Sequence, residues 1–227
     1  MIIKCKCMYS IIKRFFDILF SLIVICLLSP FFIILFPLLR FTGEGYIFYY
    51  QKRIGLKNKT FNIIKFATML KDSPNLGTGL ITLRNDPRLT PMGNFLRITK
   101  LNELPQIFNV LKGDMSFIGP RPLVDKQFAT YTEHVQANIY NVRPGITGIG
   151  SIVFRDEERL ITDSNIDPRE FYNTVIAPYK GALEMWYLEN QSFKTDFLIL
   201  FLTAWCIVFS ESKLVNIFFK TLPAKTF

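Results

Sequence analysis

Apolar residues fill almost every position between residues 15 and 39, and Asp17 is the one charged residue among them. At ~1.5 Å per residue, a straight helix of this length reaches across the ~30 Å hydrocarbon core of a bilayer. A carboxylate near the start of such a helix must stay close to the interface or pair with a cation such as Arg14. The pattern therefore predicts a helix inserted in a membrane.

Two further features oppose a simple membrane span. Basic residues flank both ends of the apolar run, Arg14 before it and Arg40 after it, so the charges favour neither orientation. Ser29 and Pro30 fall in its middle, where proline bends or breaks a helix because it removes a backbone donor. We therefore expect residues 1–42 to form a re-entrant helix hairpin, with a kinked single span as the alternative. The run is long for a signal peptide and lacks a small-residue cleavage site.

The rest of the chain mixes the periods of strands and helices. Aromatic and β-branched residues at 46–50 and 61–66 predict a small β-hairpin. Periodic apolar residues, and a run of charges at 155–160, predict helices over 101–111, 123–141, 155–160, 167–186 and 197–209. The last of these is too short to cross a bilayer and is expected to be buried or interfacial. We therefore expect a helix-dominated α+β fold, in which residues 43–227 form a globular domain with interfacial C-terminal helices.

Residues 97–122, RITKLNELPQIFNVLKGDMSFIGPRP, bring helix and turn signals together. Asn102 is a good N-cap for the helix that follows, and Gly113 is a natural end for it. Glu103 would then lie at the positive end of the helix, next to a site suited to phosphate groups. Across a tight turn follows Arg121, which is held between two prolines. We therefore expect phosphate-handling chemistry in this stretch.

The net charge of +9 indicates an anionic partner, which is nucleic acid, a lipid surface or a phosphorylated substrate. Nine basic residues but two acidic ones lie in the first 60 positions, where they bracket the apolar run. This distribution favours a membrane surface over nucleic acid, for which the chain has no recognisable reader motif. The turn of the predicted β-hairpin carries four of these charges and is expected to contact lipid phosphates: Lys52, Arg53, Lys57 and Lys59.

The four cysteines do not resemble a disulfide framework. Cys26 and Cys206 lie in apolar runs, where cysteine behaves as a small apolar residue. Cys5 and Cys7 form a C-x-C pair, but no second pair follows and the chain has one histidine, so a four-ligand zinc site is not expected. This usage fits the reducing, cytosolic side of a membrane. The Gly-Thr-Gly at 77–79 lacks the rest of a phosphate-binding loop and is interpreted as a turn.

Motifs along nearly the whole chain carry a family resemblance. They are KRFFDILFS and LLSP in the apolar run, then YYQKRIG, KFATM, DPRLTPMGNFLR, LNELPQIFNVLKGDMSFIGPRP and RPGITG, and finally YLENQS followed by Asp196. With these motifs in this order, the chain resembles the bacterial sugar transferase family, the monotopic polyprenyl-phosphate phosphoglycosyl transferases.

The resemblance implies an enzyme that moves a sugar 1-phosphate from a UDP-sugar to undecaprenyl phosphate and releases UMP. This reaction is the first membrane step in making a surface polysaccharide or glycoconjugate. The resemblance also implies a re-entrant helix in the bacterial inner membrane, a catalytic domain on its cytosolic face, and Mg²⁺ as cofactor. The expected partners are the donor, the lipid acceptor and membrane lipid, without nucleic acid. The oligomeric state, a homo-oligomer included, is left open.

The resemblance also assigns site residues. Glu103 is the expected Mg²⁺ ligand, because this ion typically uses one or two carboxylates together with substrate phosphates. Four basic residues are expected to bind substrate phosphate, the arginines through their planar forks: Lys65, Arg97, Arg121 and Arg143. The structural alternatives are ordinary, since an arginine beside proline is commonly a turn residue and a glutamate in the first turn often serves the helix dipole.

Two positions depart from the family's pattern. The family has an Asp-Glu pair in which Asp is the nucleophile, whereas this chain has Asn102 before Glu103. Since a carboxamide is a far poorer nucleophile than a carboxylate, three hypotheses follow. The lipid phosphate attacks directly, Glu103 becomes the nucleophile, or the protein is catalytically silent and acts as a membrane-bound partner in glycan assembly. Ala67 stands where the family usually has arginine, which removes one basic contact.

Overall fold

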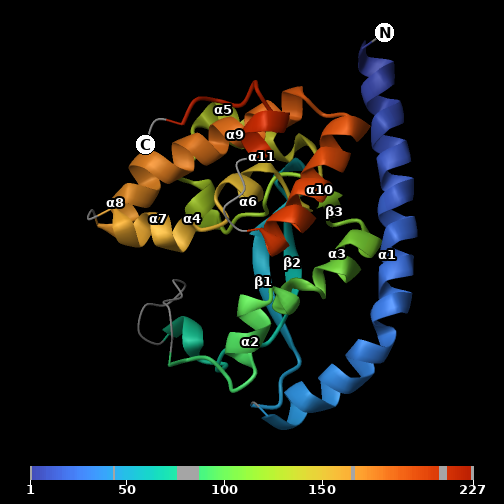
Figure 1. The fold of residues 1–227 in the computed structure, drawn as a ribbon, viewed down its shortest axis with the longest axis vertical. Helices are drawn as coiled ribbons and strands as arrows, with labels where there is room; N and C mark the ends of the chain where they lie inside the picture. Colours follow the sequence, from blue (N-terminus) through green and yellow to red (C-terminus); the bar gives the residue numbers. More distant parts are fainter. Residues whose placement is uncertain (1, 43, 76–86, 165–166, 210–213, 226–227) are drawn as a thin grey trace. The chain divides into compact units, whose positions relative to one another are not determined.

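The computed structural model describes residues 2–42, 44–75, 87–164, 167–209 and 214–225, and at residues 2–7, 74, 158 and 207–208 the backbone alone. In this part of the chain the fold is helix-dominated, as the sequence predicts, and it has two small sheets where the sequence predicts one β-hairpin (Figure 1). The helices are α1 (Ile2–Thr42), α2 (Gly93–Ile98), α3 (Gln106–Lys112), α4 (Asp125–Phe128), α5 (Glu133–Asn138), α6 (Ile149–Val153), α7 (Glu157–Asp163), α8 (Pro168–Phe171), α9 (Ala177–Glu189), α10 (Phe193–Val208) and α11 (Leu214–Phe218).

Short 3₁₀ turns, one π-turn and four strands are the other elements in the described residues. The 3₁₀ turns are η1 (Leu56–Asn58), η2 (Ser73–Asn75), η3 (Leu101–Glu103) and η4 (Ile139–Asn141), and the π-turn is η5 (Tyr172–Ile176). The strands are β1 (Phe48–Ile54), β2 (Thr60–Phe66), β3 (Ser116–Ile118) and β4 (Gly145–Thr147).

The chain forms two compact units. The large unit contains Met1–Asp17, Lys52–Phe61 and Gly113–Phe227, and the small unit contains Ile18–Gln51 and Asn62–Lys112. The sequence predicts a different division, at residue 42, between a membrane segment and a catalytic domain. This division stays a prediction.

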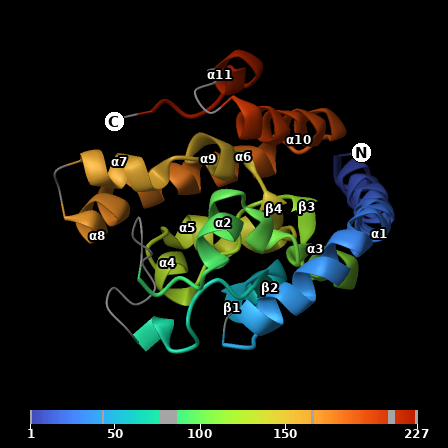
Figure 2. The same ribbon diagram turned by 60° about the horizontal axis from the view of Figure 1, so that its bottom comes forward.

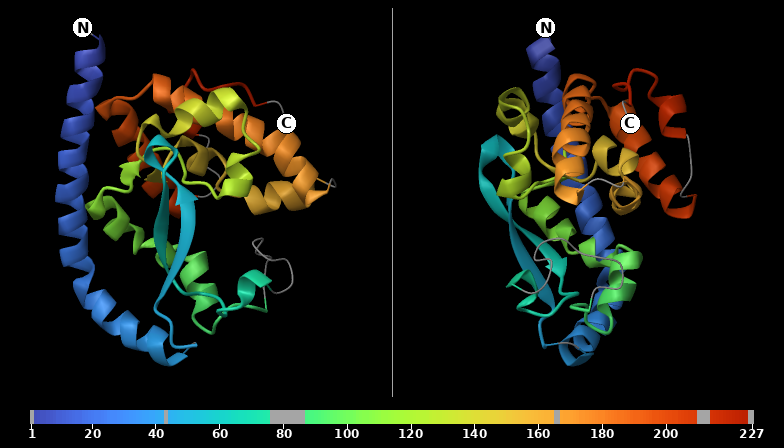
Figure 3. Two further views of the ribbon diagram at one scale, coloured as in Figure 1. Left: turned by 180° about the vertical axis from the view of Figure 1, so that it is seen from behind. Right: turned by 90° about the vertical axis from the view of Figure 1, so that its left-hand side faces the viewer.

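Helix α1 is continuous from Ile2 to Thr42 and contains Pro30 and Pro37. Its ribbon changes direction before its C-terminal end (Figures 1 and 3). The Ser29 hydroxyl donates a hydrogen bond to the carbonyl oxygen of Cys26, at 2.8 Å, which is the type of side-chain bond that accompanies helix bending. The helix therefore continues through Ser29 and Pro30, where the sequence predicts a break, and the re-entrant hairpin stays a prediction.

The small unit buries one face of α1. Phe32, Leu35 and Leu39 are spaced three and four residues apart and pack with Phe66 of β2 and Leu96 of α2 in the core. The opposite face of the helix is apolar but exposed: Ile33 and Ile34 are each 72% exposed and Phe41 is 84% exposed. Met8–Thr42 is one described segment that is long and apolar enough to cross a membrane. A helix apolar on both faces, with one face uncovered, is what a lipid-contacting segment requires.

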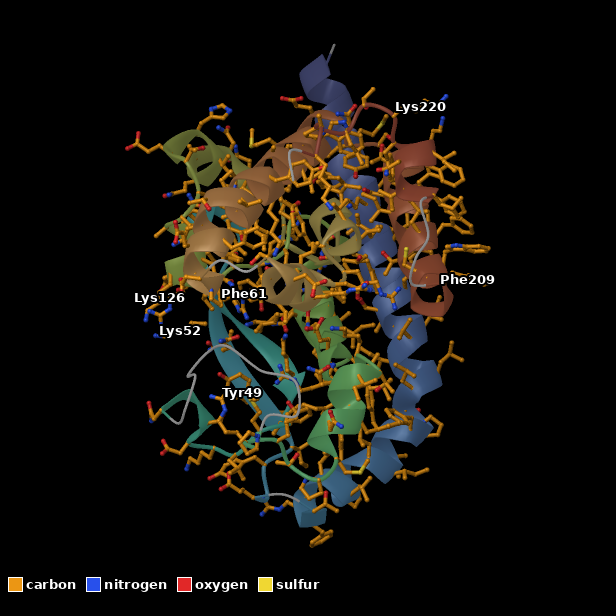
Figure 4. All side chains as sticks on the ribbon, turned by 60° about the vertical axis from the view of Figure 1, so that its left-hand side comes forward. Tyr49, Lys52, Phe61, Lys126, Phe209 and Lys220 are labelled. Carbon is orange, nitrogen blue, oxygen red and sulfur yellow. The ribbon has the colours of Figure 1, made fainter. Side chains whose placement is uncertain are left out.

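Strands β1 and β2 pair in a two-stranded sheet, which confirms the predicted β-hairpin (Figure 3). Residues Lys57 and Asn58 of the connection both have φ of 56°, the left-handed conformation that tight hairpin turns require. Lys52 projects outward from the hairpin (Figure 4), and Lys57 and Lys59 are exposed as well. Arg53 is half-buried and donates to the carbonyl oxygen of Pro122, at 3.1 Å. The contact of these four residues with lipid phosphates stays a prediction.

Strands β3 and β4 form a parallel pair in the large unit, with Ser116 opposite Gly145. The sequence pattern does not predict this pair, because each strand has three residues and too few positions to show a period. Glycine is required beside it: a Cβ on Gly145 would lie 2.2 Å from the backbone nitrogen of Gly119, and one on Gly148 would lie 2.3 Å from the Gly119 carbonyl oxygen. The glycines of the RPGITG motif therefore let two backbone segments touch.

The helices of the large unit differ from the predicted ones mainly in continuity. The helix predicted over 123–141 is wrong as one element, because α4, α5 and η4 replace it. In the small unit, the helix predicted over 101–111 is divided into η3 and α3, so Asn102 lies inside a 3₁₀ turn and is not an N-cap. Gly113 does end α3, with φ of 101°.

The last part of the chain agrees with the predicted helices. Asp167 caps α8 by accepting hydrogen bonds from the backbone N–H groups of Arg169 and Glu170, at 3.0 Å each. Ser192 caps α10 by accepting from Thr195 N–H at 3.1 Å. Helix α6 lies between α9 and α10 (Figure 2), and a shared core contains Ile149, Leu183, Tyr187, Ile199 and Leu202.

Two polar contacts attach the start of α1 to the rest of the large unit. The Asp17 carboxylate accepts hydrogen bonds from the Ser116 hydroxyl and the Phe117 backbone N–H of β3, each at 3.1 Å. Asp196 of α10, which is 7% exposed, accepts from the Tyr9 hydroxyl at 2.6 Å and forms an ion pair with Lys13. Contacts between α1 and β3 and between α1 and α10 therefore help to satisfy two buried carboxylates, and Asp196 also accepts from the Tyr187 hydroxyl at 2.8 Å.

We expect Asp196→Ala to lower the free energy of unfolding by about 3–5 kcal/mol, because it leaves the Lys13 ammonium half-buried without its partner. The control is Asp163→Ala, which breaks an exposed pair with Arg159 (3.5 Å, side chains 67% and 76% exposed) and is expected to change stability little. Denaturant unfolding of both variants in the same detergent measures the difference. Equal losses would contradict the assignment of Lys13 and Asp196 as a stabilising buried pair.

Candidate functional site

Two of the predicted site residues meet in the small unit. The Lys65 ammonium of β2 lies 2.6 Å from the carboxylate of Glu103, with 16% and 19% of their side chains exposed. Lys100, directly before η3, has φ of 59° in the left-handed region, where a residue other than glycine is strained. This turn starts the 3₁₀ segment that carries Glu103. The pair is therefore held by a strand on one side and a strained turn on the other.

Asn102 lies beside Glu103 in η3 but is buried, with 9% of the residue exposed. Its side-chain oxygen Oδ1 has no hydrogen-bond partner among the described residues. A buried polar atom without a partner is costly, and such atoms in native proteins commonly accept from a water or ligand. Asn102 therefore offers a neutral oxygen at the position of the family's nucleophile.

Arg97 lies in the last turn of α2 in the same unit and is half-buried. The turn η3 begins three residues after the end of α2. The Lys100 backbone N–H, directly before η3, donates to the Arg97 carbonyl oxygen at 3.1 Å and so links the end of α2 to this turn. The small unit therefore contains four of the predicted residues: Lys65, Arg97, Asn102 and Glu103.

Arg121 and Arg143 lie in the large unit. Their backbone segments are in contact, since the Gly145 N–H donates to the Pro120 carbonyl oxygen at 2.8 Å. The Arg143 side chain donates from Nε to the Gly113 carbonyl oxygen, at 2.9 Å. The six residues thus fall into two groups, one in each unit.

The described residues contain no group of three histidine, cysteine, aspartate or glutamate side chains that could hold a metal ion. A site for Mg²⁺ must therefore rely on few protein ligands. The Glu103 carboxylate and the Oδ1 of Asn102, which lacks a hydrogen-bond partner in the described part of the chain, are both hard oxygen donors, the type that Mg²⁺ prefers. The ion commonly completes its shell with water and substrate phosphates. The residues of η3 therefore fit such an ion.

Sequence reasoning missed a buried polar cluster in the large unit. Glu184 of α9 is 3% exposed and accepts a hydrogen bond from the Arg121 backbone N–H. Burial raises the pKa of this carboxyl to about 8, against the opposing effects of that hydrogen bond and of the charges of Lys180 and Arg121. Lys180 pairs with Glu157 at 2.6 Å and lies over the ring of Tyr172. A lone glutamate in an apolar helix carries no distinguishing signal, so only its neighbours in space reveal it.

The raised pKa predicts a pH dependence of stability. Below about pH 4.5, the ordinary pKa of this carboxyl, Glu184 is protonated in both the folded and the unfolded chain. Between that value and about 8 the unfolded chain ionises first, so the stability contribution of the neutral carboxyl is lost as the pH rises. We expect the midpoint of thermal unfolding of wild type to fall relative to that of Glu184→Gln across this window. Parallel curves for the two proteins would contradict the raised pKa.

Several other predictions concern cysteines and turns. Cys26 and Cys206 are free thiols, exposed and buried respectively. The side chains of Cys5 and Cys7 and the turn at 77–79 lie outside the described residues, so their predictions stay open.

Comparison with known proteins places these residues in a family context. A family model described as bacterial sugar transferase matches residues 8–210. The exopolysaccharide production protein ExoY of Sinorhizobium fredii is 31% identical over 208 residues, which cover 86% of this chain and 84% of that protein.

Two longer relatives carry names that state a reaction. The undecaprenyl-phosphate galactose phosphotransferase of Salmonella typhimurium is 34% identical over 207 residues, which cover 85% of this chain and 40% of that protein. The UDP-galactose-lipid carrier transferase of Erwinia amylovora is 31% identical over 206 residues, 85% of this chain and 39% of that protein. The chain therefore spans about two fifths of the length of these two relatives.

Proposed function

Because the chain belongs to the bacterial sugar transferase family, an enzyme family, we propose that it transfers a sugar 1-phosphate from a UDP-sugar to undecaprenyl phosphate. The products are undecaprenyl-diphosphate-sugar and UMP, and the step begins the assembly of a surface polysaccharide or glycoconjugate. One observation carries the proposal: the family match over residues 8–210 includes all six predicted site residues. The names of the relatives support the lipid acceptor and, for one of them, the UDP-linked donor.

The chain's own residues bind and orient the donor. Arg97, Arg121 and Arg143 bind phosphate oxygens through their planar guanidinium groups, and Lys65 adds a point charge beside Glu103. Glu103 would hold Mg²⁺, with Asn102 Oδ1 as a neutral second oxygen. The ion, when bound, supplies positive charge that stabilises the negative charge of the diphosphate. Positioning and charge stabilisation of this kind account for most of the catalysis in phosphoryl transfer.

We propose direct attack by the lipid phosphate, because Asn102 lacks the charge of a nucleophile. An oxygen of undecaprenyl phosphate forms a bond to the β-phosphorus of the donor. The bond from that phosphorus to the oxygen bridging the two phosphates breaks, and this oxygen leaves as part of UMP. Asn102 positions groups in this mechanism, whereas the alternative has Glu103 forming a covalent intermediate.

The exposed apolar face of α1 supports membrane association. We propose that residues 1–42 form a re-entrant segment bent at Ser29 and Pro30, which makes the protein monotopic. Residues 43–227 would then form the catalytic domain on the cytosolic face of the bacterial inner membrane, with its C-terminal helices at the interface. Exposed apolar residues of α10, such as Phe197 at 68% and Leu200 at 46%, support the interfacial position. A homo-oligomer is compatible with this arrangement.

The test is a donor panel. Purified protein in detergent is incubated with Mg²⁺, undecaprenyl phosphate and UDP-sugars of different kinds, and UMP is measured. Release of UMP with one donor, dependent on the lipid phosphate, is the expected result.

A second candidate rests on Asn102, which replaces the family's nucleophile. In it the protein is catalytically silent and acts as a membrane-bound partner in glycan assembly. A preparation that binds UDP-sugars but releases no UMP with any of them would favour this candidate and reject the enzymatic proposal.

A further inference from the structure

Two buried side chains hold the backbone of Arg121 from opposite sides of the residue. Glu184 accepts a hydrogen bond from the Arg121 N–H. The Tyr140 hydroxyl donates to the Arg121 carbonyl oxygen at 2.8 Å and accepts from the Leu123 N–H at 3.0 Å. Glu184 lies on α9 and Tyr140 on η4, and the two residues are 3% and 1% exposed. Both polar groups of the Arg121 backbone are therefore satisfied by the core of the large unit.

The residues around Arg121 need such support. They lie outside helices and strands, so no regular hydrogen-bond ladder fixes them. Pro122 restricts Arg121 to extended conformations, but it does not fix the direction of the segment relative to the core. Two further hydrogen bonds hold the two residues after Arg121. The Arg53 guanidinium donates to the Pro122 carbonyl oxygen at 3.1 Å, and the Ile54 N–H donates to the Leu123 carbonyl oxygen at 2.9 Å.

We infer that Glu184 and Tyr140 are positioning residues, which fix the backbone of Arg121 so that its guanidinium is presented to substrate phosphate. The inference rests on the proposed function for the role of Arg121. It adds two residues, 19 and 63 positions away along the chain, to those on which substrate binding depends. Neither residue needs to touch the substrate.

The packing around Glu184 fixes its side chain. A Cβ on Gly150 of α6 would lie 2.6 Å from one Glu184 carboxyl oxygen, so a side chain at residue 150 would displace this carboxyl from its place. The other carboxyl oxygen has no hydrogen-bond partner among the described residues. Four charged or titratable groups interact electrostatically with this carboxyl: Arg121, Lys180, Tyr131 and Tyr140.

A glutamine is expected to replace Glu184 in this role. With its pKa raised to about 8 by burial, the carboxyl is largely protonated at neutral pH and accepts the Arg121 N–H as a neutral group. The amide oxygen of glutamine accepts in the same way, and the side chain has nearly the same shape. Leucine fills the same space but leaves the N–H without an acceptor.

The experiment compares Glu184→Gln, Glu184→Leu and Tyr140→Phe in the full-length protein in detergent. Glu184→Leu and Tyr140→Phe are expected to raise KM for the UDP-sugar about tenfold, because a displaced arginine binds phosphate less well. Glu184→Gln is expected to keep KM within about twofold of wild type. In an Arg121→Ala background, Glu184→Leu should cause no further rise, since the group that it positions is gone.

A second readout separates this inference from the proposed function. Binding of UDP is measured by calorimetry for the same proteins, and thermal unfolding checks that each is folded. If wild type releases no UMP, the proposed function fails, and the positioning role is then judged on weaker UDP binding by Glu184→Leu that Glu184→Gln restores. Unchanged KM and UDP affinity in both Glu184→Leu and Tyr140→Phe would overturn the inference. It would also be overturned if Glu184→Leu raised KM as much in the Arg121→Ala background as it does in wild type. If Glu184→Leu does not fold, Tyr140→Phe alone decides.

Discussion

Glu103→Gln is expected to lower the rate of UMP release by about 1,000-fold or more. Removing one preorganised charge-stabilising group from an active site commonly costs ~10²–10³ in rate, and Glu103 is also the expected Mg²⁺ ligand. The Lys65 ammonium, 2.6 Å away, would face a neutral amide in place of a carboxylate. Glutamine has the shape of glutamate, so the fold of η3 should persist.

The measurement is UMP release at saturating donor and lipid phosphate, with Mg²⁺ varied. Glu133→Gln is the matched control, since Glu133 lies exposed on α5 and has no assigned role. Loss of activity in Glu103→Gln with retained thermal stability supports a catalytic role. A variant that keeps more than about a tenth of the wild-type rate would remove Glu103 from the centre of the mechanism.

Asn102→Asp is expected to make the protein form a covalent intermediate that wild type does not form. The change restores a carboxylate beside Glu103, in the place of the family's nucleophile, and a carboxylate attacks phosphorus far better than a carboxamide does. Under direct attack Asn102→Ala should keep activity within about tenfold of wild type, because Asn102 then only positions groups. The buried position of Asn102, at 9% exposure, places any new carboxylate in a partly desolvated environment.

Intact-protein mass spectrometry after mixing with donor alone tests this expectation. Asn102→Asp should gain the mass of one sugar phosphate, and the double variant that combines Asn102→Asp with Glu103→Ala should show less of it. The same mass gain in wild type would instead identify Glu103 as the nucleophile and reject direct attack. No mass gain in any variant, with UMP release intact, would indicate direct attack even when an aspartate is present.

Local sequence patterns determine those helices and strands whose formation depends on residues close together in the chain. The apolar run predicts α1, and the aromatic and β-branched runs predict the β1–β2 hairpin. These features follow from residues at most four positions apart, where periodicity, capping and turn preferences act. The wrong predictions have the same local origin. The helix predicted over 123–141 is interrupted, because the spacing of apolar residues does not reveal where the chain must turn.

The motifs and their order also carried the resemblance to the family, and that resemblance named the candidate site residues. What they left open is which of these residues meet. Lys65 and Glu103 are 38 positions apart, and their contact follows from the packing of η3 against β2. Likewise, the loss of the expected N-cap at Asn102 follows from the strained turn at Lys100, whose left-handed backbone no local preference for lysine predicts.

The sequence by itself thus determined a basic, helix-dominated chain of the bacterial sugar transferase family, and it predicted membrane association and the positions of the phosphate-binding residues. The tertiary structure alone decided that Asn102 is buried and that its Oδ1 has no hydrogen-bond partner among the described residues. It also decided that Lys65 faces Glu103 and that Glu184 accepts from the backbone of Arg121, 63 positions away. The physical reason is that burial and hydrogen bonding between distant segments depend on how the whole chain packs. Because a carboxyl such as Glu184 takes its pKa and its partner from that packing, no local pattern can indicate either.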